Sequence, residues 1–391
     1  MKIGIDGGCL ANKRGFGRFA RHALAALARA NTSHELVVFV DRPSLAAAGV
    51  PEGVRRVVVD VAEAPSRAAS SAGRRRFADL FAMSRATARE RLDLLYFPAS
   101  YSYFPPWNVG RVVVTMHDVL AFRHPHLVFT NGRGRLAWRL KEQAAVRRAD
   151  LIMTVSESAR RDLIACFRLD RDRVRAVHEA ADAVFRPLAR DAACDAALAA
   201  AGLAPDAKFL LYVGGLSPHK NLPRLIEAFT RAAPPDWLLT LVGDLGDGFH
   251  SHVPALREHV ARLRLEARVL FTGYLSDEIL VHLYNRSIAL AQPSLLEGFG
   301  LPAVEAMACG APVVASRAGS LPEVVGDAGI YFNPRDVEAI ARAIAALRDD
   351  PALRDDLARR AVERARRFDW GRTGRALVEA FESCAGGRRS P

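Results

Sequence analysis

Cysteine is scarce in this chain, and the cysteines present form no pattern. Five cysteines stand among 391 residues, with no Cys-x-x-Cys pair and no cluster of histidines. Disulfide frameworks and zinc sites both depend on such spacings. The sequence therefore excludes a disulfide-stapled scaffold and a structural zinc site. It predicts reduced thiols at Cys9, Cys166, Cys194, Cys309 and Cys384.

Long apolar stretches are missing too. Half of the residues are hydrophobic, but no apolar run approaches the roughly 20 residues that span a bilayer. A strand is expected to start at Lys2, directly after Met1, which leaves no room for a signal peptide. We therefore expect a cytoplasmic protein, and a chain of 391 residues suits two domains better than one.

Acidic residues fall short of basic ones in the first half only. Residues 1–190 contain 32 Lys and Arg against 18 Asp and Glu, whereas the remaining residues contain 23 against 25. A basic half fits an anionic partner, either nucleic acid or an anionic membrane surface with its phosphate-bearing lipids. An arginine-rich genome would produce the same excess without any such partner.

Strands and helices alternate along the chain. The alternation predicts two doubly wound α/β domains, residues 1–187 and 188–370. The strands expected in the first domain are Lys2–Asp6, Glu35–Val40, Val54–Val59, Leu94–Phe97, Val112–Thr115, Leu151–Val155 and Val174–Val177. Those expected in the second are Phe209–Val213, Leu238–Val242, Val269–Thr272, Ile288–Ala291 and Val313–Ala315.

A basic helical stretch is expected between Ser66 and Leu92. It sets Arg74–Arg76 next to Phe77 and further apolar residues. A basic amphipathic helix can lie on a membrane surface. An ordinary helix that covers the sheet and leaves its arginines in solvent fits the same pattern.

A glycine-containing loop follows the first strand. Residues 12–18 include Gly15 and Gly17 and lead into an expected helix, Phe19–Ala30. Loops of this kind between a strand and a helix can cradle phosphates. The third glycine of the dinucleotide-binding fingerprint is missing, so the loop excludes that motif and is either phosphate-binding or a plain connection.

A second glycine loop follows the strand Phe209–Val213. It covers Gly214–Asn221 and contains Gly215, Ser217 and Lys220. Backbone N–H groups and a lysine between a strand and a helix predict an anion-binding corner.

The most informative stretch is Pro293–Pro312, which follows an apolar strand. Glu297 stands in a turn, and glycines such as Gly300 let the backbone approach a ligand closely. A Leu-Pro pair then opens a helix, and Glu305 lies one turn inside it. Free N–H groups, a positive helix end and two acids predict a site for a phosphate attached to a group rich in hydroxyls.

His117 follows the expected strand Val112–Thr115. The carboxyl edge of a parallel sheet faces the crevice in which open α/β sheets bind ligands. A ligand-facing role and a structural role fit this histidine equally well.

Together these segments resemble the retaining glycosyltransferases of family 4. The resemblance runs from Met1 to about residue 385 and depends above all on two glutamates at Glu-x7-Glu spacing in a glycine- and proline-rich context. The segments that carry it are Gly15–Arg18, His117–Asp118, Val213–Asn221, Phe271–Leu275, Glu297–Gly310, Gly319–Glu323 and Phe368–Trp370. It implies the α/β GT-B fold, in which two Rossmann-like domains face each other across an interdomain cleft. It also implies that a C-terminal helix at about 371–385 joins the first domain.

The resemblance implies transfer of a sugar from a nucleotide diphosphate to an acceptor with retention of the anomeric configuration. The first domain would bind the acceptor and the second the donor. As catalytic residues, Lys220 would hold the diphosphate, Glu297 the sugar and distal phosphate, and His117 would face the sugar or the acceptor hydroxyl. The implied donor-binding residues are Gly15, Gly17, Gly214, Gly215, Ser217, Tyr274, Leu275, Gly298, Phe299, Gly300, Leu301 and Glu305.

Within this set, Glu305 would bind the ribose hydroxyls and Tyr274 would lie near the base. One position departs from the family. Gly215 stands where many members have an arginine as a second phosphate-binding cation. His219 and Arg317 are the candidates to replace that charge.

The implied reaction needs no cofactor and no metal. Lys220 and the helix N–H groups would stabilise the departing phosphate, and no Asp-x-Asp pair stands at a suitable strand end. The expected partners are a nucleotide-sugar donor, a glycan or lipid-linked acceptor and an anionic membrane surface. The last would be met at the inner face of the membrane through the basic first half. No nucleic acid is expected.

The Gly214–Asn221 loop is similar to that of mannosyl- and rhamnosyltransferase-like members, which favours GDP-mannose and the synthesis of a surface polysaccharide or glycoconjugate. Two alternatives remain open. One is a nucleotide-sugar epimerase of GT-B fold, and the other is a non-catalytic protein that binds nucleotide-sugars or polyanions.

Overall fold

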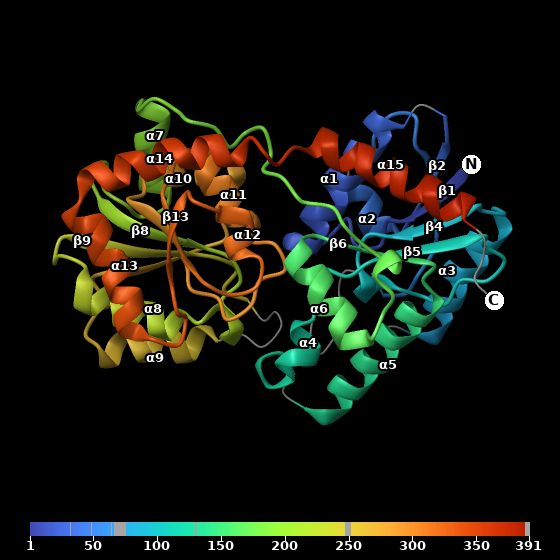
Figure 1. Cartoon of the computed structure of the whole chain (residues 1–391), viewed down its shortest axis with the longest axis horizontal. Coiled ribbons are helices and arrows are strands. Elements are labelled where there is room, and N and C mark those ends of the chain that lie inside the picture. Colours follow the sequence, from blue (N-terminus) through green and yellow to red (C-terminus); the bar gives the residue numbers. More distant parts are fainter. Residues whose placement is uncertain are drawn as a thin grey trace. The chain divides into compact units, whose positions relative to one another are not determined.

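The structure is a computed structural model that describes residues 1–31, 33–47, 49–63, 65, 76–129, 131–246 and 252–387. The chain divides into two compact units. One comprises residues 1–179 and 369–391, and the other comprises residues 180–368. Each unit is a parallel sheet covered by helices on both faces (Figure 1).

The first unit contains a seven-stranded sheet. Its strands are β1 (Lys2–Asp6), β2 (Glu35–Val40), β3 (Arg55–Val58), β4 (Leu94–Phe97), β5 (Arg111–Thr115), β6 (Leu151–Thr154) and β7 (Val174–Ala176). All neighbours pair in parallel, in the order β3-β2-β1-β4-β5-β6-β7. The central strands are almost continuously apolar because helices cover both faces of the sheet. This is why the pattern of the sequence predicted them.

The helices of the first unit include one from the far end of the chain. They are α1 (Gly15–Ala30), α2 (Arg42–Ala47), α3 (Phe77–Arg89), α4 (Leu120–Arg123), α5 (Gly132–Arg148), α6 (Glu157–Phe167) and α15 (Trp370–Gly386). α15 packs along α1 (Figure 1). A Cβ on Gly374 would lie 2.4 Å from the carbonyl oxygen of Ala26, so glycine allows this close approach.

The second unit contains a six-stranded parallel sheet. Its strands are β8 (Lys208–Val213), β9 (Trp237–Val242), β10 (Val269–Gly273), β11 (Ala289–Gln292), β12 (Val313–Ser316) and β13 (Gly329–Phe332), in the order β10-β9-β8-β11-β12-β13. Its helices are α7 (Ala192–Ala200), α8 (Leu222–Ala232), α9 (Val253–Arg262), α10 (Asp277–Arg286), α11 (Leu301–Ala308), α12 (Leu321–Val325), α13 (Val337–Asp349) and α14 (Pro351–Ala365).

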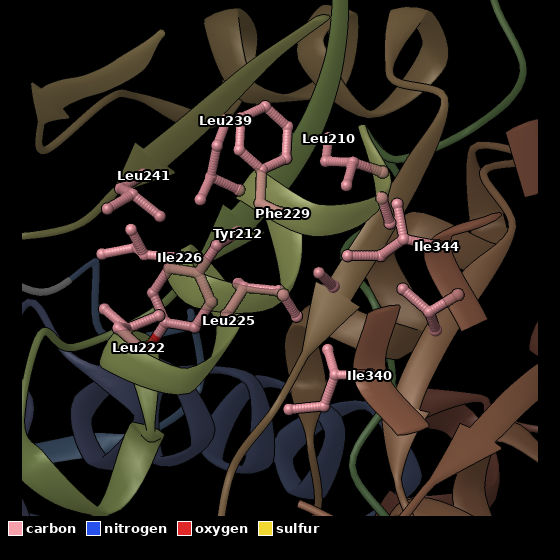
Figure 2. Packing of buried hydrophobic residues seen from close by; sticks show 14 of the residues in the cluster. Leu210, Tyr212, Leu222, Leu225, Ile226, Phe229, Leu239, Leu241, Ile340 and Ile344 are labelled. Carbon is pink, nitrogen blue, oxygen red and sulfur yellow. The ribbon is translucent and has the colours of Figure 1, made fainter. Parts of the chain in front are cut away.

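A large apolar core fixes α8 and α13 against this sheet. Leu225 and Phe229 of α8, four residues apart, pack with Ile340 and Ile344 of α13 over Leu210 of β8 (Figure 2). Residues at this spacing lie on one face of a helix. The packing holds the N-terminus of α8 beside the carboxyl end of β8.

Three expectations about secondary structure need correction. The first helix begins at Gly15, not at Phe19, so Gly15 and Gly17 lie in its first turn and not in a loop before it. The sequence pattern placed the start too late because glycine is a poor helix former. Here the side-chain oxygen of Asn12 accepts the amide of Arg14 at 2.7 Å and starts the turn.

The second correction concerns β13, a strand that the sequence did not predict. It has four residues and begins with a glycine, so its apolar run is too short to stand out. The third concerns the basic stretch, of which residues 66–75 lie outside the described residues, Arg74 and Arg75 among them; helix α3 covers Phe77–Arg89 and ends before Leu92. Within the described parts of the chain, no helix combines the length and apolarity needed to span a membrane.

Candidate active site

The carboxyl ends of β8 and β11 meet where the connections of the second sheet change direction. From β8 the chain proceeds to β9 and β10 on one side, and from β11 it proceeds to β12 and β13 on the other. Open α/β sheets bind ligands outside such a switch point. The loops that leave it cover residues 214–221 and 293–300, and both were predicted from sequence to bind the donor.

Glycines allow the loops at this edge to touch backbone to backbone. A Cβ on Gly319 would lie 2.5 Å from the carbonyl oxygen of Glu297, and one on Gly243 would lie 2.1 Å from that of Gly214. Neither contact could form with a side chain present. Glycine at positions 243 and 319 therefore allows the loops after β8, β9, β11 and β12 to pack into one surface.

Lys220 and Glu297 form an ion pair at this edge. Nζ of Lys220 lies 2.7 Å from Oε1 of Glu297, and the hydroxyl of Ser294 donates to the same oxygen at 2.6 Å. The Lys220 and Glu297 side chains are 18% and 12% exposed. A lysine ammonium has three donors. Among the described residues only Glu297 accepts from it, which leaves two donors for a ligand.

The charge state of Glu297 follows from these contacts. Burial opposes its ionisation, but the charge and hydrogen bond of Lys220, the Ser294 hydroxyl and the nearby His219 outweigh that effect. They hold the pKa of Glu297 below its usual value. Glu297 is therefore an ionised acceptor, which is the form that binds sugar hydroxyls.

The turn after Glu297 leads into the N-terminus of α11. Gly300 has φ +96°, in the left-handed region that favours glycine, and Leu301 begins the helix. The hydroxyl of Ser320 donates to the carbonyl of Phe299 at 2.7 Å, and the Phe299 ring packs edge-on against Phe368 at a centroid distance of 5.5 Å. The loop that contains Gly298 is thus fixed. Pro302 has no N–H and the amide of Ala303 donates to the carbonyl of Gly300 at 2.9 Å, so of the first three residues of α11 only Leu301 offers its amide to an anion.

The loop after β8 is equally ordered. Gly214 has φ +148°, and the Tyr212 hydroxyl donates to the carbonyl of Gly215 at 2.6 Å. Ser217 precedes a single 3₁₀ turn, Pro218–Lys220. This turn places the lysine two residues before the start of α8.

Glu305 and Tyr274 lie in very different surroundings. Glu305 is only 2% exposed, and its Oε2 accepts the hydroxyl of Tyr284 at 2.9 Å. Tyr274 follows β10 and is 63% exposed, and Leu275 beside it is half-buried. The ribose contact of Glu305 and the base contacts of Tyr274 and Leu275 stay predictions.

The two candidates to replace the missing arginine at Gly215 differ in position. The charge of His219 acts on Glu297 and helps to lower its pKa, so His219 belongs to the Lys220 corner. The guanidinium of Arg317 lies over the ring of Tyr331 instead, 5.1 Å from its centroid. A role of His219 as the second phosphate-binding cation stays a prediction.

In the first unit, His117 stands just beyond the carboxyl end of β5. Its Nε2 lies 3.1 Å from the carbonyl oxygen of Pro98, and its Nδ1 lies 3.6 Å from a carboxylate oxygen of Glu179. The rings of Phe16 and Phe19 contact it edge-on, with centroid distances of 5.0 and 4.8 Å. The imidazole is thereby held in one orientation.

Gly15 and Gly17 flank Phe16 in the first turn of α1. A Cβ on Gly17 would lie 1.8 Å from the carbonyl oxygen of Asn12, whereas one on Gly15 would meet nothing within 4 Å. The close contact with Asn12 therefore requires a glycine at position 17, whereas a side chain at position 15 would have room.

Two buried acids near His117 were missed from the sequence. Glu179 is 5% exposed and follows β7 by three residues, so its place after a parallel strand was a usable signal. Glu142 of α5 is 3% exposed and accepts the Ser100 hydroxyl at 2.8 Å. Burial raises the pKa of Glu142. Nothing in the local sequence marks it, because its burial depends on how α5 packs.

The structure thus groups the candidates by unit. Gly15, Gly17 and His117 lie in the first unit, and all the other predicted residues lie in the second. In the described parts of the chain, no group of three or more His, Cys, Asp or Glu side chains is placed to hold a metal ion.

Comparison with known proteins identifies the family. The profile described as "Glycosyl transferases group 1" matches residues 195–367, and that of "Glycosyltransferase Family 4" matches residues 13–184. O-antigen chain mannosyltransferase B of Escherichia coli is 33% identical over 301 residues, which cover 75% of each chain. The chain belongs to glycosyltransferase family 4. It is a retaining glycosyltransferase, as the resemblance implied.

Solved structures of the family share the fold. Sucrose-phosphate synthase from Thermosynechococcus elongatus superposes with a TM-score of 0.75 at 22% identity, over 98% of each chain. HepE from Anabaena, solved in complex with UDP-glucose, has a TM-score of 0.73 at 23% identity, over 98% of this chain and 100% of its own. The predicted GT-B fold is confirmed.

Proposed function

We propose that this glycosyltransferase transfers mannose from GDP-mannose to a surface polysaccharide in assembly, or to another lipid-linked glycan, without a metal. Support for the sugar and the pathway comes from the relative in Escherichia coli, which is named as an O-antigen chain mannosyltransferase. The structural neighbour HepE was solved in complex with UDP-glucose, so uridine nucleotides are the donors to compare with GDP-mannose.

The observation that carries the proposal is the ion pair of Lys220 and Glu297 beside the start of α11. Cleavage of the bond between the anomeric carbon and the phosphate leaves positive charge on the sugar and negative charge on the phosphate. A lysine ammonium and helix N–H groups stabilise the phosphate, and an ionised glutamate accepts hydrogen bonds from the sugar hydroxyls. Lys220 would therefore stabilise the departing phosphate, and Glu297 would bind the sugar that becomes positively charged.

The surroundings of Glu297 also favour a binding role over a role as proton donor. Its Oε1 already accepts from Lys220 and Ser294, and its lowered pKa makes it a poor proton donor. With Glu297 in a binding role, the acceptor oxygen attacks the anomeric carbon from the face that the phosphate leaves. The new glycosidic bond forms as the bond to phosphate breaks, and a phosphate oxygen takes the acceptor's proton.

The first unit is proposed to bind the acceptor. His117 is held by Pro98, Glu179 and two phenylalanine rings, so an acceptor hydroxyl would meet a ring of fixed orientation. Such positioning accounts for a large share of catalysis in transfer reactions.

We propose that the protein binds to an anionic membrane surface. On α3, Phe77 and Phe81 are 90% and 58% exposed, and Phe81 packs against Trp107, which is 43% exposed. Aromatic rings in a strongly basic half of the chain suit the interface of an anionic bilayer. Co-sedimentation with phosphatidylglycerol vesicles, but not with phosphatidylcholine vesicles, is the expected result. Equal sedimentation with both would contradict it.

A thermal-shift screen with GDP, UDP, ADP and dTDP tests the donor. GDP should raise the unfolding temperature most, and incubation with GDP-mannose and a mannose-terminated lipid-linked acceptor should then give an α-mannoside. A larger shift with UDP, followed by transfer from UDP-glucose, would replace mannose by glucose in the proposal.

A further inference from the structure

A pocket lies at the outer edge of the sheet in the second unit. It has a volume of about 560 Å³, within the range of about 300–1,000 Å³ that is usual for small-molecule sites. Its walls are the end of β13 and one face of α13. Ile340 and Ile344 of α13 point into the core (Figure 2), whereas Arg342 faces the pocket.

Two arginines give this pocket a positive charge. Its described lining includes Arg317 and Arg342 but no Asp or Glu. Arg317 lies over the ring of Tyr331 and has no carboxylate partner among the described residues. Arg342 has a side chain that is 71% exposed and lies 3.7 Å from Asp336, whose other oxygen accepts the amide of Ala339 and caps α13. Both guanidinium charges are therefore weakly compensated.

The rest of the lining suits a ligand rich in hydroxyls. Among the described strands, β13 is the outermost of its sheet and pairs only with β12, so its other edge offers backbone donors and acceptors. Asn333 adds a side-chain amide, and Ala339 and Ala343 leave room for a ring.

The pocket is joined to the loops that were assigned to the donor. The side-chain amide of Asn221 donates to the carbonyls of Pro293 and Pro334, at 3.0 and 2.7 Å. Pro293 begins the loop that contains Glu297, and Pro334 lines the pocket. β13 is two strands away from β11, or about 10 Å at the usual strand spacing. A ligand in the pocket would therefore lie beside a bound donor without sharing its residues.

We propose that this pocket binds a sugar unit that carries a phosphate or a carboxylate. Arg317 and Arg342 bind the anionic group, and Asn333 and the edge of β13 bind the hydroxyls. The source of that sugar rests on the proposed function: it is either an acidic unit of the acceptor glycan or a free sugar phosphate.

Calorimetric titration with mannose 6-phosphate tests the site. We expect saturable binding by the wild-type protein, no binding of neutral mannose, and binding at least about tenfold weaker in R317Q/R342Q, because each arginine supplies a charge-assisted hydrogen bond. R359Q/R360Q removes two exposed arginines of α14 in the same unit and should bind like wild type. The single variant Arg342→Gln, which leaves the contact of Arg317 with Tyr331 intact, should also bind more weakly.

Equal binding by R317Q/R342Q and wild type, or displacement of mannose 6-phosphate by GDP, would overturn the proposal. The failure of the proposed function has a different signature, since it would appear as a thermal shift that is absent with all nucleotides or larger with UDP than with GDP. A hyaluronan tetrasaccharide, as an acidic glycan, separates the sources. Tighter binding of the tetrasaccharide than of mannose 6-phosphate supports the pocket as an acceptor site, and the reverse order supports it as a site for free sugar phosphate.

Discussion

Two regions are built in different ways: the loops of the second unit that are proposed to bind the donor (residues 214–221 and 293–300, the donor loops) and the surroundings of His117 in the first unit (the His117 corner). At the donor loops, the backbone of one loop touches the backbone of the next through Gly243 and Gly319, and one ion pair, Lys220 with Glu297, lies on that surface. The His117 corner is built from side chains, since Phe16, Phe19 and Glu179 reach the ring from separate elements. The first arrangement depends on a local motif, and the second depends on the packing of the whole unit.

This difference predicts which substitutions should change donor affinity and which should change turnover. A charge change in the donor loops removes a ligand contact and leaves the scaffold in place. A change around His117 alters the orientation of one ring and should affect turnover more than donor affinity. The predictions below test this contrast, from the largest expected effect to the smallest.

The largest effect is expected for Lys220→Ala. Loss of the charge that is proposed to face the leaving phosphate should lower kcat/KM by about 100- to 1,000-fold. Lys208→Ala is the matched control, because Lys208 forms an exposed pair with Asp236 at 2.8 Å in the same unit. Steady-state kinetics that show similar losses for both lysines would remove the special role of the donor loops.

A smaller loss of activity is expected for Glu179→Gln. The change weakens the hold on His117, and a misplaced ring should lower kcat by about 10- to 100-fold while donor affinity stays constant. Glu382→Gln is the control, since Glu382 forms the other His–Glu pair of this unit, with His34 at 2.9 Å and with its own side chain 52% exposed. If donor affinity falls together with kcat, the division between the two regions is wrong.

Two glycines in one helical turn allow a stability test. Gly17→Ala should destabilise the protein by about 1–3 kcal/mol, because its Cβ would meet the carbonyl of Asn12 at 1.8 Å. Gly15→Ala, with nothing within 4 Å, should stabilise α1 by up to about 1 kcal/mol. Urea unfolding of both variants measures the difference, and equal midpoints would contradict the packing described for this turn.

The two regions should also respond to pH in opposite ways. The pKa of Glu297 is lowered, so its contribution to stability is present above about pH 4.3 and is lost as the pH falls through its lowered pKa. The pKa of Glu142 is raised by burial, so its contribution is present below about pH 4.3 and is lost as the pH rises through its raised pKa.

Glutamine variants test these signs. The destabilisation by Glu297→Gln should shrink towards low pH, and Glu142→Gln should gain stability relative to wild type as the pH rises. Urea midpoints between about pH 2 and pH 8 provide the measurement, because the effect of Glu297 falls below about pH 4.3 and that of Glu142 above it. Parallel curves for either variant and wild type would show that its glutamate does not titrate as its surroundings imply.

The same contrast explains what the sequence could predict. Every strand except β13, and the loops at 214–221 and 293–300, follow from local patterns, since apolar runs and glycine turns determine them, and the structure has both. The start of α1 at Gly15 was missed because a contact from Asn12 overrides helix propensity. Glu142 and the pocket beside β13 depend on the packing of distant segments, which no local pattern encodes.

The most direct test of the central claim is calorimetric titration of GDP-mannose into wild type, Lys220→Ala and Lys208→Ala. The claim is that the Lys220–Glu297 pair at the start of α11 holds the donor. It predicts one saturable site in wild type and in Lys208→Ala, and at least about tenfold weaker binding in Lys220→Ala. Unchanged affinity in Lys220→Ala would contradict the account.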